Sequence, residues 1–397
     1  MAKGKNFKKT TRNRKIYCPY CRKIMTKIQK VVTLRNYKSK TIIKFIQLAK
    51  TMHPEYQYLN LLKEILENWV EKDDRTWIWV KGLFGAQMRF DLSSGEFPLL
   101  TTKKTFLRWI IVELIWLIRW ETNIKYLVDN NVHIWDEWPF QNWLENSNEV
   151  DPSKYPKYSE DWYKLKEEFI EKIKNLPEDD TWLITWWDLG PVYWHWWRNF
   201  WWWEVSNWWV KDIKKRQWWF PGGIRTLKKL WIKLTWTDQL SNVIDKILNK
   251  PTDRRMIVNA WNPQQLPMML LPPCHMFYQF NVDTKNKKLN LQMYQRSADM
   301  FLWVPFNIAS YSALLLIISK LTWLKAGEFV HTLWDVHIYK NHFKQVKTQL
   351  ERQPYPWPKL EIKKDLKTLE DVENLKWEDF ELIDYKSHDP IKAPVAV

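Results

Sequence analysis

Cys274, in the second half of the chain, has neighbours that could make it a nucleophile. It lies in the segment Leu271–His275 (LPPCH), just before a predicted strand, and Arg296 ends the strand after that one. A lone cysteine is more often a buried apolar residue. If the guanidinium of Arg296 lies beside the sulfur, however, it lowers the pKa of the thiol and favours the thiolate. The sequence therefore leaves a catalytic and a structural role for Cys274 both open.

Two further groups of charged residues could bind an anion or move protons. Arg254 and Arg255 are adjacent and follow a turn. Paired arginines are usually solvated, but with Arg75 and Arg296 this pair could hold a phosphate through bidentate hydrogen bonds. Glu113 is the one acid in an apolar helical segment. It either faces a polar gap or is a general acid or base whose pKa is raised by burial.

The elements that must position these residues include both strands and helices. Apolar residues at helical spacing predict helices over 58–70, 108–119, 237–249 and 307–321. Strands are expected over 256–262, 276–283, 289–296 and 329–339, and the range 77–92 predicts a strand, a turn and a second strand. Mixed elements of this kind favour an α/β or α+β domain.

Charge divides the chain into two parts. Residues 1–51 hold sixteen of the 62 Lys and Arg residues and no acid, so they carry almost all of the net charge of +17. We expect a basic extension that is disordered or precedes the true start at Met52, followed by one folded domain over 52–397. A nucleic-acid-binding arm is the alternative. Cys18 and Cys21 have the spacing of half a zinc site, but no second cysteine pair completes it.

Several classes of protein are disfavoured by composition. Three cysteines in 397 residues cannot form a disulfide framework, which favours a reducing compartment and a cytoplasmic location. The apolar runs are shorter than the ~18–20 residues of a membrane span, and the basic N-terminus is not followed by a signal-peptide apolar region. We therefore expect neither a membrane nor a secreted protein.

A series of short motifs resembles the folate-dependent thymidylate synthase family. The resemblance runs from about His53 to Val397, with the motifs in the order of the family. The motifs are DRT at 74–76, FPLLTTKK at 97–104, IWDEW at 134–138, LGPVY at 189–193, RR at 254–255, AWN at 260–262, PPCH at 272–275, QRSAD at 295–299, VPFNIASY at 304–311 and KAPVAV at 392–397.

The resemblance implies a fold and a reaction. The fold is of the α+β type, a large mixed sheet flanked by helices, with a small helical insertion at 139–187 and a low-complexity loop at 201–230. The reaction is the reductive methylation of dUMP to dTMP, in which 5,10-methylenetetrahydrofolate gives both the carbon and the hydride. No metal is required by this chemistry.

The resemblance also implies roles for individual residues. The Cys274 thiolate adds to C6 of the uracil, and Arg296 activates it. The remaining catalytic residues are Glu113, Tyr193, His275 and Asn307. The residues expected to bind dUMP are Arg75, Arg254, Arg255, Arg296, Ser297, Asp299, Asn307, His337 and Tyr339. Those expected to bind the folate are Ile134, Trp135, Asp299, Phe306 and Val397. The family further implies a homodimer in which Arg254 and Arg255 reach the phosphate of the other subunit.

Tryptophan and glycine depart from the family in a regular way. The chain has 31 Trp and only 8 Gly, about 2% against a usual ~7%. We hypothesise that UGA codons, written here as Trp, encode Gly in the native host. The rival is a Trp-rich protein that is overpacked at these sites. The Trp residues that stand at usual Gly positions of the family are Trp77, Trp79, Trp120, Trp187, Trp194, Trp303, Trp323 and Trp334, with Trp69 and Trp236 similar; Trp196 stands where the family has Gln.

Other functions fit part of the sequence. A pyrimidine hydroxymethylase of the same superfamily is the nearest alternative, but a cytosine-specific site would favour Asp in place of Asn307. A nucleic-acid-binding protein would use the basic arm and the aromatic stretch 201–236. If the protein really contains Trp at these positions, and Trp303 and Trp334 fill space near the nucleotide, the sequence indicates an inactive relative of the enzyme.

Overall fold

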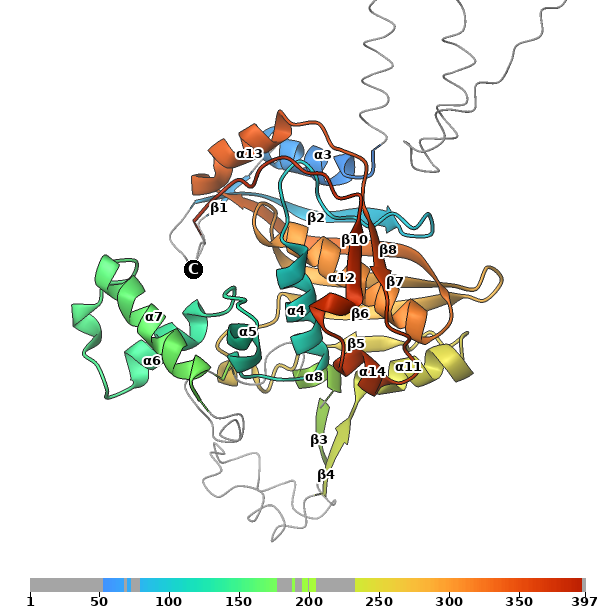
Figure 1. Cartoon of the computed structure of the whole chain (residues 1–397), viewed down its shortest axis with the longest axis horizontal. Helices are drawn as coiled ribbons and strands as arrows, with labels where there is room; N and C mark the ends of the chain where they lie inside the picture. Colours follow the sequence, from blue (N-terminus) through green and yellow to red (C-terminus); the bar gives the residue numbers. More distant parts are fainter. Residues whose placement is uncertain are drawn as a thin grey trace, which may run out of the picture.

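A computed structural model describes residues 53–67, 70–72, 79–176, 188–189, 195–198, 200–204 and 233–394. The predictions made for the basic arm with Cys18 and Cys21, for most of the loop at 201–230, and for Arg75, Tyr193 and Val397 lie outside these residues. The described part combines one large sheet, helices on one of its faces and a small helical unit (Figure 1). The expected α+β fold with a mixed sheet is confirmed.

The large sheet has six strands in the order β1 (Val70–Lys72), β2 (Val80–Asp91), β8 (Lys325–Tyr339), β7 (Lys288–Asp299), β6 (His275–Asp283) and β5 (Ile257–Asn259). All neighbouring pairs are antiparallel except β7 and β8, which are parallel. Parallel neighbours need a crossover connection. Helix α12 (Trp303–Leu321) supplies it, and the residues before and after this helix thereby come to lie side by side.

One face of the sheet is covered by apolar helices. Helix α12 packs on β7 and β8, and α4 (Leu107–Ile118) packs on α12 (Figure 1). Both helices are apolar around most of their circumference, as expected for helices buried on several sides. The length and composition of α12 would also suit a membrane span, but 78% of the relevant stretch is buried inside the protein, as in a core helix.

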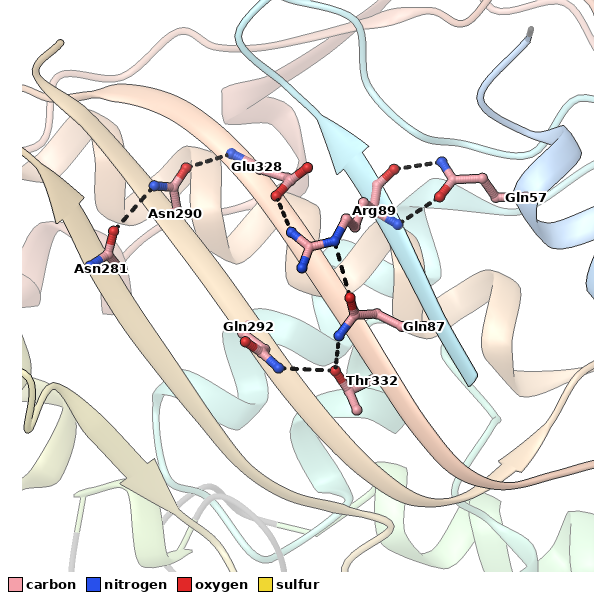
Figure 2. Close-up of polar contacts among 8 residues, drawn as sticks. All are labelled: Gln57, Gln87, Arg89, Asn281, Asn290, Gln292, Glu328 and Thr332. Atoms are coloured by element: carbon pink, nitrogen blue, oxygen red, sulfur yellow. Dashed lines mark hydrogen bonds and ion pairs between the residues drawn. The ribbon is translucent and has the colours of Figure 1, made fainter. Parts of the chain in front are cut away.

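The opposite face of the sheet carries polar and aromatic side chains. Figure 2 shows Gln87 and Gln292 both donating to Oγ1 of Thr332 at 3.0 Å, and Arg89 paired with Glu328 at 2.7 Å. A row of rings crosses four strands on this face, with centroids 5.3–5.7 Å apart: Phe277, Tyr294, Trp334 and Phe84. We call this surface the open face.

The remaining elements surround the sheet or form the insertion. The described part of the insertion expected at 139–187 holds most of α6 (Glu137–Asn146) and all of α7 (Glu160–Lys174), which pack through Phe140, Trp143 and Phe169. The other elements are α3 (Tyr56–Glu67), α5 (Lys125–Asp129), α6 (Glu137–Asn146), η1 (Pro152–Lys154), α7 (Glu160–Lys174), α8 (His195–Arg198), β3 (Phe200–Glu204), β4 (Lys233–Thr237), α11 (Gln239–Asn249), η3 (Leu266–Met268), η4 (Lys340–His342), α13 (Phe343–Leu350), β9 (Lys359–Ile362), α14 (Leu369–Glu373), η5 (Trp377–Asp379) and β10 (Phe380–Ile383).

Two predictions about the N-terminal elements are wrong. The first helix ends at Glu67 rather than Val70, because Val70 pairs with Gly82 in the sheet. The range 77–92 does not contain two strands, since β2 runs unbroken from Val80 to Asp91 in register with β8. Gly85 interrupts the pattern only locally: it has a φ of 81°, which glycine adopts without steric cost.

Four of the Trp residues at usual Gly positions are well exposed. The exposed fractions of Trp79, Trp120, Trp323 and Trp334 are 50%, 47%, 75% and 41%. Overpacking by a Trp side chain therefore gives no argument for glycine at these four positions. Trp334 does not approach the predicted nucleotide-binding residues through its ring contacts, which are with Phe84 and Tyr294 on the open face.

Backbone conformation distinguishes two of these Trp residues. Trp120 and Trp323 follow the ends of α4 and α12 with φ values of 56° and 54°. At a helix end this left-handed conformation is usually filled by glycine, because a side chain there costs free energy. The structure thus supports the glycine hypothesis at Trp120 and Trp323 through the backbone rather than through packing.

Candidate active site

The candidate nucleophile lies at the start of β6. Cys274 is half-buried, and its carbonyl accepts the backbone N–H of Arg296 at 2.8 Å. The Arg296 side chain folds back along the same segment, donating from Nε to the Pro273 carbonyl and from Nη2 to the Pro272 carbonyl, both at 2.8 Å. The two prolines thus hold the guanidinium beside the cysteine segment, an arrangement that the sequence had left open.

Next to the cysteine lies a row of buried polar side chains. His275 pairs with Gln295 in the β6–β7 register, and its ring meets Tyr311 edge-on at 5.2 Å. Gln295 donates to Oδ1 of Asn307 at 3.1 Å. Burial lowers the pKa of His275 to about 4, while a hydrogen bond with Asn307 partly opposes this effect. His275 is therefore a neutral imidazole at physiological pH.

The parallel pair β7–β8 brings a second group of predicted residues together. Asp299 is opposite His337 in the register, and the rings of His337 and Tyr339 meet edge-on at 5.1 Å. Oδ1 of Asp299 accepts the backbone N–H groups of Phe301 and Leu302 at 3.0 and 3.2 Å, which fixes this carboxylate where α12 begins. Burial would lower the pKa of His337, but hydrogen bonding with Asp335 and the nearby Asp299 carboxylate raise it.

Glu113 projects from the core helix α4 toward the segment before α6. Its Oε1 accepts the indole N–H of Trp135 at 2.7 Å. Burial raises the pKa of Glu113 to about 7, and the Trp135 hydrogen bond lowers it in part. The carboxylate also acts electrostatically on Tyr311, the ring that contacts His275. Of the two alternatives that the sequence left open for Glu113, the geometry favours the one with a raised pKa.

Known proteins resemble this chain over most of its length. The family model of thymidylate synthase matches residues 56–397. The thymidylate synthase of Mycoplasma mobile (strain ATCC 43663 / 163K / NCTC 11711) is 45% identical over 341 residues, which are 86% of this chain and 99% of that protein.

The chain belongs to the thymidylate synthase family. It is an enzyme of the methyltransferase class in dTMP biosynthesis. Within the described residues, no cluster of three or more His, Cys, Asp or Glu side chains could hold a metal ion.

Two of the predicted phosphate ligands of this thymidylate synthase family member lie on the surface. Arg254 and Arg255 are exposed on the turn before β5, and Arg255 pairs with Asp253 at 3.0 Å. Gln279 of β6 donates to the Arg254 carbonyl at 2.8 Å, and it lies two residues from Phe277 of the aromatic row, on the same side of the strand. The two arginines are therefore placed toward the edge of that face rather than in the buried group around Asn307.

The C-terminal segment of the chain lies against the residues around Asp299. His342 is fully buried, and its Nε2 donates to the Pro394 carbonyl at 2.7 Å. Its Nδ1 lies 4.0 Å from Oδ1 of Asp299. His388 donates its backbone N–H to Thr101 at 2.8 Å. The chain up to Pro394 is thus anchored close to the site, and Val397 follows beyond the described residues.

The predicted folate-binding residues lie in two places, beside Glu113 and on the first turn of α12. Trp135 is buried against Trp116 and Trp138, with ring centroids 6.0 and 5.2 Å away, and Ile134 is half-buried beside it. Phe306, on the first turn of α12, meets Trp303 at 6.2 Å. Trp303 therefore does lie beside a predicted ligand-binding residue.

Three buried residues of the site have no predicted role: Gln295, Tyr311 and His331. Gln295 and Tyr311 occur within family motifs, and His331 lies on β8 six residues before His337, so that both project from the same side of the strand. Strand spacing could have pointed to His331. Its contact with Gln295 could not be foreseen, because it depends on how β7 and β8 pair.

Proposed function

We propose that the chain converts dUMP to dTMP with 5,10-methylenetetrahydrofolate as cosubstrate, with release of dihydrofolate. The observation that supports this most directly is the position of Arg296. Its two hydrogen bonds to the carbonyls of Pro272 and Pro273 hold a fixed positive charge beside Cys274. Cys274 is the proposed nucleophile, and the thiolate is the reactive form of cysteine.

The proposed reaction begins with addition of the thiolate to the pyrimidine. A bond forms between Sγ of Cys274 and C6, and the electron pair of the C5–C6 double bond moves toward C4 and O4. C5 thereby becomes nucleophilic. Asn307 binds the N3 and O4 edge, where negative charge develops. Glu113, with a pKa of about 7, moves protons at the pyrimidine, and Tyr193 supports removal of the C5 proton.

The other groups of dUMP are assigned to residues around the Cys274 segment. We place the phosphate with Arg296, Ser297 and Arg75, together with Arg254 and Arg255 from the second subunit. We assign binding of the ribose hydroxyl to His337 and Tyr339, which are neighbours on β8.

The chain also has residues that suit a folate. When bound, the folate supplies a one-carbon unit and a hydride. The aromatic side chains of Trp135 and Phe306 suit a flat ring, with Ile134 beside them, and the fixed carboxylate of Asp299 suits the N–H groups of a pterin. Val397 is assigned to closing the site and excluding water.

The site is proposed to be completed by a second copy of the chain. The open face combines a row of aromatic rings with paired polar groups, and Phe84 in this row is 71% exposed. Such a surface is suited to packing against a copy of itself in a two-fold dimer. Because Arg254 and Arg255 lie toward the edge of this face, the dimer would place them near the partner subunit's site.

Subunit mixing tests the dimer. Neither Cys274→Ser nor the double variant Arg254→Ala/Arg255→Ala should be active alone. A mixture of the two should regain activity, since one site of each mixed dimer then has both its own Cys274 and two intact arginines from the partner. A mixture as inactive as its components would refute the shared site.

Product analysis tests the reaction. We expect the full-length enzyme to form dTMP and dihydrofolate in equal amounts from dUMP, and Cys274→Ser to form neither. Ser93→Ala, at an exposed turn after β2, is the control and should retain full activity. Formation of a hydroxymethyl product without dihydrofolate would instead support the hydroxymethylase alternative.

A further inference from the structure

The orientation of the Gln295 amide is determined by a carbonyl group. Its Nε2 lies 2.9 Å from the Ser297 carbonyl oxygen and 3.1 Å from Oδ1 of Asn307. A backbone carbonyl can only accept, so the NH2 group of Gln295 must face Ser297. Gln295 is 2% exposed, and water therefore cannot replace these partners freely. The same NH2 group then serves Asn307, whose Oδ1 must be the acceptor.

The other end of the Gln295 amide faces His331. Oε1 of Gln295 lies 2.8 Å from Nε2 of His331, whose side chain is fully buried on β8. Because Oε1 is an acceptor, Nε2 must carry the proton. Burial lowers the pKa of His331 to about 3, so the ring is neutral and has a single N–H. Nδ1 has no hydrogen-bond partner in the described part of the chain, as suits the nitrogen without a proton.

These constraints form a chain of hydrogen bonds with one direction. His331 donates to Gln295, and Gln295 donates to Asn307. Each link fixes the orientation of the next amide, because an amide turned by 180° would place two donors or two acceptors against each other. With Oδ1 of Asn307 held in this way, its Nδ2 group remains the donor end.

We infer that His331 is a specificity-determining positioning residue, which acts through Gln295 to keep Asn307 in the orientation that accepts uracil and rejects cytosine. This inference rests on the proposed role of Asn307 at the N3 and O4 edge. Uracil presents an N–H donor at N3 and an acceptor at C4, whereas cytosine presents an acceptor at N3 and an NH2 donor at C4. A fixed amide suits only the first pattern. An amide free to turn over suits both.

The inference predicts an effect on discrimination rather than on activity in general. A well-oriented pair of hydrogen bonds contributes about 1–3 kcal/mol to discrimination between bases, or about 5- to 150-fold. In His331→Phe, Oε1 of Gln295 has no donor, and the Ser297 carbonyl alone then orients the two amides. We expect the ratio of kcat/KM for dUMP to that for dCMP to fall by about tenfold or more.

Two further variants separate positioning from packing. His331→Gln can place an amide N–H where Nε2 of the imidazole lies, and should retain discrimination within about threefold of the wild type. Phe329→Leu, on the same strand, removes a buried ring that stacks on His331 at 5.5 Å but leaves every hydrogen bond of the chain in place. It should lower Tm without changing the ratio. A ratio that is unchanged in a folded His331→Phe variant would overturn the inference.

A measurement on the wild-type protein decides the question if His331→Phe does not fold. Nitrogen-15 NMR of histidine-labelled protein should show His331 protonated at Nε2 and bare at Nδ1 at neutral pH. A proton on Nδ1 would overturn the inference. Failure of the proposed function has a different signature: the wild type would then not turn over dUMP with the folate, whatever the tautomer of His331.

Discussion

Nε1 of Trp135 lies 2.7 Å from Oε1 of Glu113, and this hydrogen bond joins the segment before α6 to the core helix α4. The indole N–H is a donor only, so it stabilises the carboxylate rather than the carboxylic acid. Burial acts in the opposite direction and is the larger effect, which leaves the pKa of Glu113 at about 7. The protonation state of Glu113 at neutral pH is therefore set by two opposing contributions, and one of them can be removed by mutation.

Trp135→Phe should raise the pKa of Glu113 above 7, because it removes the hydrogen bond that favours the ionised form. If the reaction needs the carboxylate, the acidic limb of the profile of kcat/KM against pH should move to higher pH. Trp138→Phe is the matched control, since Trp138 lies on the first turn of α6 and its ring centroid is 5.2 Å from that of Trp135. Identical profiles for the two variants would contradict the assignment.

Glu113→Gln should change how stability depends on pH. The folded-state pKa of about 7 lies above the ordinary carboxyl value of 4.5, so the folded protein binds this proton more tightly than the unfolded chain does. The resulting contribution to stability is complete below about pH 4.5 and is lost as the pH rises through about 7. Gln does not titrate.

The free energy of unfolding of Glu113→Gln, relative to wild type, should therefore increase by up to about 3 kcal/mol between pH 4.5 and 8. Urea denaturation at both pH values measures this difference. A difference that does not vary with pH would mean that Glu113 titrates normally. Glu113→Gln should also lose activity, although its free energy of unfolding relative to wild type increases with pH.

Arg296→Lys should impair the enzyme although the positive charge remains. Lys cannot donate to the carbonyls of Pro272 and Pro273 in the planar geometry of a guanidinium. Loss of these two hydrogen bonds should reduce kcat/KM about 100-fold and slow alkylation of Cys274, followed by peptide mass spectrometry. Arg119→Lys, at a half-buried pair with Glu121 away from Cys274, is the control and should behave as wild type. Unimpaired alkylation in Arg296→Lys would show that charge alone is sufficient.

Replacing Trp120 and Trp323 by Gly should stabilise the protein. Each residue holds a left-handed conformation that costs about 1–2 kcal/mol for a residue with a side chain, and each substitution should add about 1 kcal/mol to the free energy of unfolding. Trp79→Gly is the matched control: Trp79 is 50% exposed but is not among the residues with positive φ, so this substitution should be neutral or destabilising. Equal effects at all three positions would argue against a conformational cause.

Peptide mass spectrometry of the protein from its native host tests the codon hypothesis directly. We expect glycine at positions 120, 303, 323 and 334. Tryptophan at these positions would refute the hypothesis, and the ring beside Phe306 at position 303 would then be part of the native site.

The sequence was sufficient for the fold class and for most helices and strands, because residue spacing carries this information, but it left open whether Arg296 lies beside Cys274. Sequence could not show that β2 is continuous, since its partner β8 is far along the chain. It also could not assign His331. A buried histidine on a strand has many uses, and only the pairing of β7 with β8 brings its Nε2 to Gln295.

The pairing of β2 with β8 has a consequence for synthesis of the protein. Phe90 is opposite Phe329, so the ribosome must add 239 residues (329 minus 90) before the partner of β2 exists. At about 5–20 residues per second this takes roughly 10 to 50 s. Throughout that interval Met88 and Phe90, both buried in the finished sheet, lack the strand that covers them. We therefore expect the nascent N-terminal half to be a substrate for chaperones, and a premature stop before β8 to yield an aggregating fragment rather than a folded intermediate.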